Sequence, residues 1–268
     1  MDYFAHPAIS NSKLGWFKKS PAHFKYFQDN RVQDSEAFLF GGASHCILFE
    51  PEKFTKEFYV IDESKRPEPG SSFGNRKNKE WKSEIYQAYS HKKIITKETH
   101  EEISVMMEAM QKHSFVQELI KDCKFEQEVF WIDPVTKLEC KKKVDGECST
   151  HRIDYKTTDD ADPIPWQKKA WKYDYYRQAG FYDLSEPKEF YFIVQEKKPP
   201  YGISIHRATN DVMDFGKNEA MLLLRNIESC IKYNQWPGYE SDIFKPGATE
   251  RELNYFDFDL PMWVRQTM

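Results

Sequence analysis

Hydrophobic positions repeat with a helical period in the first half of the chain. One apolar set follows the i, i+3, i+4, i+7 spacing of a single helix face: Ile103, Met106, Met107 and Met110. A second helix is expected from about residue 37 to residue 49, ending before Pro51. A methionine stripe of this kind is typical of a face packed on the core, so it does not indicate a ligand site.

Helix starts are marked by capping residues. Ser20 followed by Pro21 is typical of an N-cap and a first helical position, and predicts a short helix through Phe27. Ser114 with Gln117 has the spacing of a capping box and predicts the start of another. Residues 58–61 are expected to form a short strand, and the breaker-rich residues 64–75 a mobile loop.

In the second half of the chain the period changes to two. Residues 125–132, 138–144 and 150–157 predict three antiparallel strands, with turns at Asp133-Pro134 and at Gly146. A long aromatic helix, two strands and a last helix are then expected at 166–184, 189–195, 201–206 and 212–233. This order predicts a mixed α/β fold, in one domain over residues 1–268 with a helical N-terminal part.

Composition narrows the class of protein. The 268 residues are 40% hydrophobic and 16% aromatic, which predicts a folded chain. We find neither a run of 18 apolar residues nor the basic and apolar regions of a signal peptide at the start, so no membrane contact is expected. The five scattered cysteines include no C-x-x-C pair, which argues against a zinc ribbon and favours a reducing, cytoplasmic location.

The net charge of −4 does not by itself indicate nucleic-acid binding, but local charge can differ from the total. Three stretches are locally basic: residues 65–79, Lys141 to Lys143, and Lys168 to Lys172. Solvated faces are the simpler interpretation of each. Two of them flank the acidic motif described next.

Acids and a lysine converge near the middle strands. Asp145 follows one predicted strand, and Asp154 and Lys156 lie two residues apart on the next, so these two share a face while Tyr155 points away. Converging carboxylates can hold Mg²⁺, and a lysine beside them can orient or deprotonate water. This arrangement suits phosphodiester cleavage. An edge hairpin with solvated charges is the alternative.

The predicted β-β-β-α-β order with D…D-x-K resembles the PD-(D/E)xK nuclease superfamily and, over nearly the whole chain, the RecE-type exonucleases. Six pieces in family order carry the resemblance: residues 20–24 (SPAHF), 42–45 (GASH), 126–131 (EQEVFW), 140–145 (CKKKVD), 154–158 (DYKTT) and 178–182 (QAGFY). A P-loop and a G-x-S-x-G elbow are both missing from the sequence, so ATP-driven translocation and serine hydrolysis are not expected.

The resemblance implies roles for the central residues. Asp145 and Asp154 would bind metal, the Tyr155 carbonyl would be a further ligand, and Lys156 would position or activate the attacking water. The family's common Arg-Pro-Asp is replaced by Lys143-Val144-Asp145, which keeps the charge and loses the proline.

Four further positions are candidates by resemblance. His45, after two glycines, would contact the metal, unless it is a half-buried histidine bonded to a carbonyl; an imidazole would favour Mn²⁺ over Mg²⁺. Glu126, with Glu128 as the fallback, would hold metal or water. Gln178 would lie near the scissile phosphate, and Tyr182, one helical turn on, is weighted below it.

The implied function is a Mg²⁺-dependent exonuclease, with Mn²⁺ able to substitute. It would digest one strand of a duplex DNA end from its 5′ end and leave a 3′ overhang for a single-strand annealing protein. A phage or prophage origin and a homo-oligomer, preferably a tetramer, are implied. Four basic residues are expected near the duplex: Lys65, Arg66, Arg76 and Lys77. A structure-specific endonuclease and a catalytically silent DNA-binding protein of the same fold are the alternatives.

Overall fold

The computed structural model describes residues 3–30, 36–65 and 72–239. The first half carries these elements: α1 (Asn11–Lys19), α2 (Pro21–Asp29), α3 (Glu36–Phe49), α4 (Pro51–Glu57), β1 (Phe58–Ile61), η1 (Glu63–Lys65), α5 (Ser72–Ala88), β2 (Lys93–Thr96), α6 (Lys97–Lys112) and α7 (Ser114–Ile120). The second half carries the others: β3 (Lys124–Ile132), β4 (Glu139–Glu147), β5 (His151–Thr158), α8 (Pro163–Lys172), α9 (Tyr175–Asp183), β6 (Glu189–Glu196), β7 (Ile203–Arg207) and α10 (Asn210–Tyr233). The fold is mixed α/β, as predicted.

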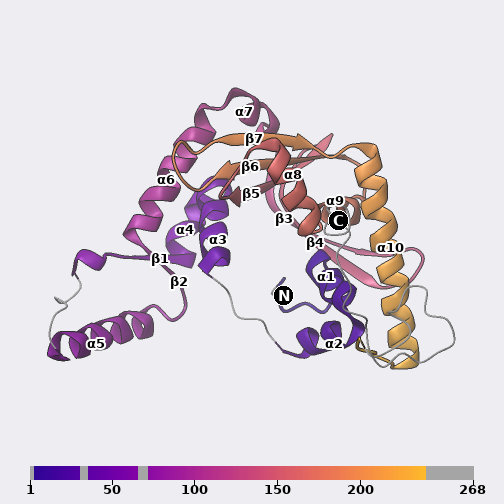
Figure 1. Ribbon diagram of the computed structural model, residues 1–268, viewed down its shortest axis with the longest axis horizontal. Coiled ribbons are helices and arrows are strands. Elements are labelled where there is room, and N and C mark those ends of the chain that lie inside the picture. Colours follow the sequence, from indigo (N-terminus) through magenta and orange to yellow (C-terminus); the bar gives the residue numbers. More distant parts are fainter. Residues whose placement is uncertain (1–2, 31–35, 66–71, 240–268) are drawn as a thin grey trace, which may run out of the picture.

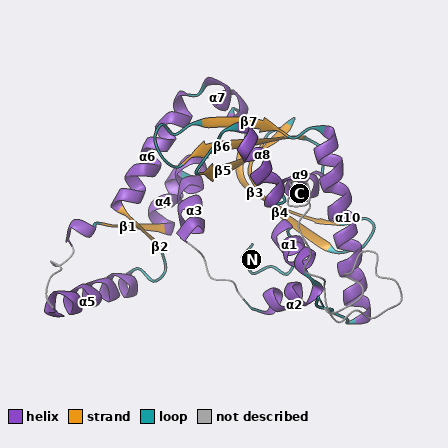
Figure 2. Ribbon diagram, in the orientation of Figure 1, coloured by secondary structure: helices purple, strands orange, loops and turns teal. Residues whose placement is uncertain are grey.

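A five-stranded sheet in the order β3-β4-β5-β6-β7 is the centre of the molecule (Figure 2). The β5–β6 pair is parallel and its neighbours are antiparallel. Side chains alternate between two hydrophobic clusters: Val144, Phe190 and Phe192 pack under α1, α9 and α10, whereas Ile153 and Tyr155 pack with the methionines of α6. Each face of the sheet is therefore covered by helices.

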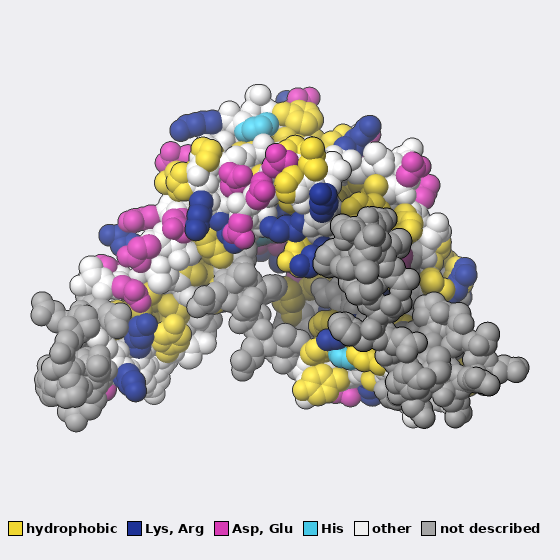
Figure 3. Space-filling model, in the orientation of Figure 1, with side chains coloured by type: hydrophobic (Ala, Val, Ile, Leu, Met, Phe, Trp, Pro, Cys, Tyr) yellow, Lys and Arg dark blue, Asp and Glu magenta, His cyan; other side chains and the backbone are white. Residues whose placement is uncertain are grey.

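Most of the helices outside the central sheet form two limbs (Figure 1). One limb holds α3 to α6 with the two-stranded β1–β2 sheet, and the other holds α1, α2 and α10. The space-filling view shows the molecule hollowed between the limbs, with lysine and arginine side chains gathered above the hollow (Figure 3). The large sheet lies above this opening.

The β4 and β5 strands form a fork. They pair only at Gly146↔Ile153 and Glu147↔Arg152, and beyond this point they separate. On the separated side of β4, Ile9 takes the place of β5: its N–H donates to the Glu139 carbonyl, and its carbonyl accepts from Lys141 N–H. The N-terminal segment thus satisfies backbone groups that β5 leaves unpaired.

Two glycines allow α9 and α10 to touch. A Cβ on Gly180 would lie 2.2 Å from Lys217 N, and one on Gly216 would lie 2.0 Å from the Tyr176 carbonyl oxygen. No side chain fits at either position, so the close crossing of these helices depends on both glycines. It sets the position of α9 over the sheet.

Most sequence-based elements are present with shifted ends. The three strands after residue 124 are antiparallel as predicted, and α2 begins at Pro21 with Ser20 as its N-cap. The prediction that Asp145 follows its strand was wrong, because β4 continues to Glu147. The stripe of Ile103 to Met110 is buried on α6, as expected for a core face.

Three local predictions were wrong. The single helix over 166–184 is two helices, since Asp174 adopts a left-handed backbone with φ 55° and separates α8 from α9. Residues 72–75 belong to α5 and not to a loop, whereas residues 66–71 lie outside the described residues. The cap of α7 is His113, whose Nδ1 accepts from Val116 N–H, so Ser114 is the first helical residue.

A disulfide joins Cys123 to Cys148. Sequence spacing gave no sign of it, because the β3–β4 pairing brings together residues that are 25 apart. Among the described residues, none of the helices has the length and apolar character needed to cross a membrane.

Candidate active site

Asp145 and Asp154 lie at the fork, where the next β4–β5 pair would have formed. The separation leaves the Tyr155 N–H without a strand partner, and Asp145 Oδ2 accepts it at 2.7 Å. Asp154 projects toward α9, where its Oδ1 accepts a hydrogen bond from Gln178 Nε2. The fork therefore brings the two carboxylates together and fixes each by a different neighbour.

His45 reaches the fork from α3. Its Nε2 lies 3.1 Å from the Tyr155 carbonyl oxygen, and its Nδ1 lies 3.4 Å from Asp145 Oδ2 and 3.7 Å from Glu126 Oε1. Burial alone would lower the pKa of His45, but the carboxylates of Asp145 and Glu126 raise it. His45 therefore lies close to Asp145, one of the proposed metal ligands. It also contacts a backbone carbonyl, which is the contact expected of a half-buried histidine without a metal role.

Glu126 has an unusual backbone for a strand residue. Its φ is 51°, and it would stand opposite Asp145 in the β3–β4 register. Alternation is broken there, since Phe125 stacks on Phe49 of one cluster while Trp131 packs on Phe181 of the other. A left-handed non-glycine residue inside a strand is strained, and such strain concentrates at functional sites.

The strained backbone separates the two glutamates. The Glu126 side chain is 11% exposed and its Oε2 lies 2.7 Å from Lys143 Nζ, whereas Glu128 is exposed. Residues two apart on a regular strand share a face, but Glu126 and Glu128 do not, because the strand turns over between them. Lys143 was missed as a partner of Glu126, and the retained charge before Asp145 was the only signal for it.

Lys156 shares the face of Asp154, as the alternation predicted. Its Nζ lies 2.6 Å from Asp154 Oδ2 and 4.8 Å from the centre of the Tyr175 ring, a cation–π contact that the sequence did not suggest. Burial alone would lower the pKa of Lys156, but Asp154 and Asp145 raise it to about 12. The side chain is an ammonium at neutral pH.

The donor set fits a divalent cation. His45, Glu126 and Asp145 each place one ligand atom within 4.8 Å of the others. Burial, with the nearby charge of Asp154, raises the pKa of Asp145 to about 7 despite the opposing effect of His45. Within the described part of the chain, Glu126 Oε1 is buried and accepts no hydrogen bond, and Asp154 Oδ2 is buried with the Lys156 ammonium beside it. A hard cation would satisfy these oxygens.

Gln178 and Tyr182 have different environments. Gln178 contacts Asp154, whereas the Tyr182 ring packs in the core and its hydroxyl donates to the Lys143 carbonyl at 3.0 Å. Packing on the core therefore accounts for Tyr182.

The basic stretches differ from their expected role. Lys141 is buried and donates to the carbonyls of Tyr3 and His6, and Lys142 is buried near Glu147. Neither is a solvated or a DNA-facing residue. Of the four residues expected at the duplex, Arg66 lies outside the described residues, as do the side chains of Lys65, Arg76 and Lys77.

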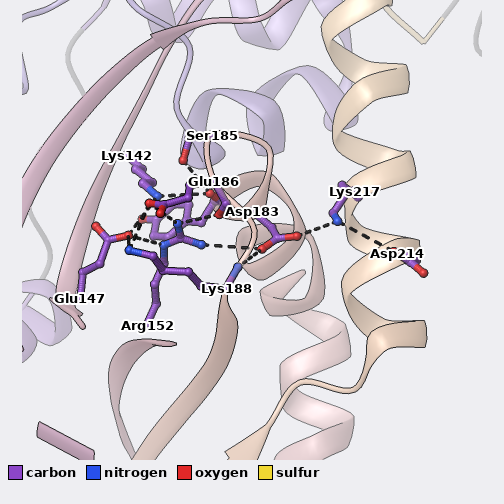
Figure 4. A network of polar contacts seen from close by, with 10 residues as sticks. Lys142, Glu147, Arg152, Asp183, Ser185, Glu186, Lys188, Asp214 and Lys217 are labelled. Carbon is purple, nitrogen blue, oxygen red and sulfur yellow. Dashed lines mark hydrogen bonds and ion pairs between the residues drawn. The ribbon is translucent and has the colours of Figure 1, made fainter. Parts of the chain in front are cut away.

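A second group of charges lies on the same face of β5, two residues before Asp154. Figure 4 shows Arg152 between Glu147 and Asp183, at 2.8 Å and 3.7 Å. Lys188 lies 3.2 Å from Glu147. The Arg152 side chain has no exposed surface. We call the labelled residues of Figure 4 the Arg152 network.

Comparisons with known proteins bear on the family and the fold. The family model of a PDDEXK-like domain of unknown function, DUF3799, matches residues 10–245. The crystal structure of a proposed exonuclease from Eubacterium rectale superposes with a TM-score of 0.60 at 12% identity, covering 93% of this chain and 92% of that one. An alkaline exonuclease from Laribacter hongkongensis covers 69% of this chain and 95% of its own at 11% identity, with a TM-score of only 0.29. Curated protein sequences gave no match.

Proposed function

Because the chain belongs to the PDDEXK-like family DUF3799, we propose that it is a divalent-metal-dependent exonuclease acting on duplex DNA ends. The observation that carries the proposal is the fork itself. Asp145, Asp154 and Glu126 converge there with His45 and Lys156, and the buried Glu126 Oε1 accepts no hydrogen bond within the described residues.

Asp145, Asp154 and the Tyr155 carbonyl would hold the metal, with His45 and Glu126 beside them. We favour Mg²⁺, and an imidazole at the site would let Mn²⁺ substitute. When bound, such a cation neutralises charge on the scissile phosphate and lowers the pKa of water.

The protein's own groups act around this centre. With its pKa raised to about 12, Lys156 donates hydrogen bonds and does not accept a proton, so it would position the attacking water and stabilise charge on the phosphate. Gln178 holds Asp154 Oδ1 and would keep this carboxylate aimed at the centre. The contact of Lys143 with Glu126 would hold that side chain in the fork.

The finer assignment follows the RecE-type resemblance. One strand would be digested from its 5′ end, and the 3′ overhang would pass to a single-strand annealing protein. A homo-oligomer, preferably a tetramer, a phage or prophage origin and a bacterial cytoplasm complete this proposal. The Cys123–Cys148 disulfide is a feature that a reducing compartment does not favour.

One experiment tests the activity. Linear duplex DNA labelled at either the 5′ or the 3′ end is incubated with the protein and Mg²⁺, beside covalently closed circular DNA and an EDTA control. We expect early release of short products from the 5′ label, slow loss of the 3′ label, no cutting of the circle, and no reaction in EDTA.

Other outcomes identify the alternatives. Cleavage of the closed circle would indicate an endonuclease, and binding without any cleavage would indicate a silent DNA-binding protein. Undiminished cleavage in EDTA would contradict the metal mechanism.

A further inference from the structure

An aromatic cavity lies beside the candidate active site. It measures about 360 Å³ and lies between α8, α9, the β6–β7 pair and the start of α10. Among its lining residues are six aromatic or imidazole rings: Trp166, Trp171, Tyr175, Tyr176, Phe192 and His206. The Trp166 ring stacks on His206, with 4.1 Å between ring centres. We call this the aromatic cavity.

Strand register connects the cavity to the site. Asp154 pairs with Phe192, and Phe192 pairs with His206, so the three residues form a row across one face of the sheet. Neighbouring strands are about 4.8 Å apart, which puts His206 roughly 10 Å from Asp154. Tyr175 bridges the two places, because its ring stacks on Phe192 and also lies over Lys156.

The charges around the cavity suit a polyanion. Its described lining residues include Arg207, which pairs with Glu189 outside the cavity at 3.3 Å, and no carboxylate; Lys168 and Lys172 are exposed on α8. A larger cavity of about 880 Å³ has a mixed lining, with the acids Asp183, Glu189, Asp211 and Asp214 beside the cations Lys188, Arg207 and Lys217, and it has no comparable cluster of aromatic rings. Aromatic rings beside a cationic surface are the combination by which proteins stack the bases of single-stranded nucleic acid.

We propose that the aromatic cavity receives an unpaired nucleobase of the DNA strand whose phosphate lies at Asp154 and Lys156. The inference rests on the proposed nuclease function and adds a base-binding site to it. Trp171, whose side chain is half exposed at the cavity, would supply a stacking surface that a base can reach. The bound base would hold the end of the strand while its phosphate is positioned.

The test measures binding without cleavage. A short 5′-phosphorylated oligothymidylate with a 3′ dye, and its abasic counterpart, are titrated with the protein in EDTA and followed by fluorescence anisotropy. We expect the wild type to bind the oligothymidylate about tenfold more tightly than the abasic strand. Trp171→Ala should lose this preference and Trp171→Phe should keep most of it.

A matched control is Phe115→Ala, since Phe115 is an exposed aromatic residue on α7, on the opposite side of the sheet from the hollow. It should bind like the wild type. Circular dichroism of each variant verifies folding.

Two results would overturn the inference. One is equal binding of the two oligonucleotides by the wild type, or a preference that survives in Trp171→Ala. The other is a Trp171→Ala protein that changes its oligomeric mass while its base preference is kept, which would make the cavity an interface between copies.

The nuclease function is judged separately, by cleavage of linear duplex in Mg²⁺. Cleavage without any base preference would retain that function and remove the cavity's role. A base preference without cleavage would support the cavity's role as a base-binding site and contradict the nuclease function.

Discussion

The charges around Asp154 and those of the Arg152 network lie on one face of β5, two residues apart, and they are neutralised differently. In the network each charged group has an oppositely charged group within 3.9 Å, from Lys142 near Glu147 to Lys217 near Asp183. At the fork, three carboxylates face two lysines and one imidazole. Lys156 lies 2.6 Å from Asp154 and Lys143 lies 2.7 Å from Glu126, whereas Asp145 has His45 as its only oppositely charged partner within 4.0 Å among the described residues.

This difference indicates that the buried charges of the Arg152 network stabilise the fold, whereas those at the fork are arranged for a ligand. A closed network keeps its stability only while all partners are present, because the loss of one leaves the others buried and unpaired. An acidic excess costs stability until a cation arrives, and such an excess is expected where a ligand completes the site.

The largest expected effect is the loss of activity on neutralising Asp145. Asp145→Asn keeps an oxygen for the Tyr155 N–H but removes the charge that holds a cation, so cleavage of linear duplex should fall to background. In EDTA, urea denaturation should give an unfolding free energy equal to or above that of the wild type, because a buried charge with a like-charged neighbour has been removed. Strong destabilisation would mean that the fork is a closed structural cluster.

The next effect is on stability, in the Arg152 network. Arg152→Met should lower the unfolding free energy by about 3–5 kcal/mol, since Glu147 and Asp183 each lose a buried partner. The control is Arg207→Met, because Arg207 is exposed and its pair with Glu189 should be worth less than about 1 kcal/mol. Equal losses in urea unfolding would contradict the comparison.

Removal of Lys156 tests catalysis apart from metal binding. Lys156→Ala should lower turnover by at least ~10²-fold, the scale of a positioned donor that stabilises charge in the transition state, and leave Mn²⁺ binding by calorimetry largely unchanged. Lys197→Ala, which breaks an exposed pair with Asp159, should cleave normally. A loss of metal affinity equal to that of Asp145→Asn would make Lys156 part of the ligand cluster.

The two glutamates of β3 offer a matched pair. Glu126→Gln should lower activity roughly 10–100-fold, as expected for a group that supports a metal site, whereas Glu128→Gln should have no effect because that side chain is exposed. Steady-state cleavage rates for both variants decide between them. A larger loss of activity in Glu128→Gln than in Glu126→Gln would make Glu128 the residue that supports the metal site.

The smallest effect is a pH dependence of stability. Burial, with Arg152 nearby and Glu147 opposing, lowers the pKa of Lys142 from 10.5 to about 8. Between these values the unfolded chain binds more protons at Lys142, so this residue contributes a rise in stability with pH of up to about 1.4 kcal/mol per unit. Lys142→Met should remove much of this slope in urea titrations at pH 8 and pH 9.5. Part of the slope should remain, because the pKa of Lys13 is also lowered to about 8 by burial. An unchanged slope would place the titration elsewhere.

Local periodicity was enough to predict much of the sheet and the pairing of Asp154 with Lys156 on one face. Both depend only on alternation within a strand, which the sequence records directly. The N-cap at Ser20 was predicted for the same reason, because a cap is decided by neighbouring residues.

Features that depend on distant residues were not predicted. The turn-over of β3 at Glu126 is imposed by two clusters on opposite faces, and the burial of Lys141 and Lys142 by segments far away in the chain. The break at Asp174 follows from its left-handed φ of 55°. Aspartate tolerates this conformation, but its presence in a sequence does not predict it. Tyr175 reaches Lys156 only because of that break.

The pairing of Ile9 with β4 has a practical consequence for anyone preparing shortened forms of the protein. Residues 3–9 precede the segment that matches the family, yet Ile9 pairs with β4 at Cys140, and Lys141 donates to the carbonyls of Tyr3 and His6. A truncation designed on the family boundary at residue 10 would remove Ile9 and leave the backbone groups of Glu139 and Lys141 unpaired on this side of β4. Loss of cleavage in such a shortened protein would therefore reflect the missing N-terminal segment, and would say nothing about the residues of the candidate active site.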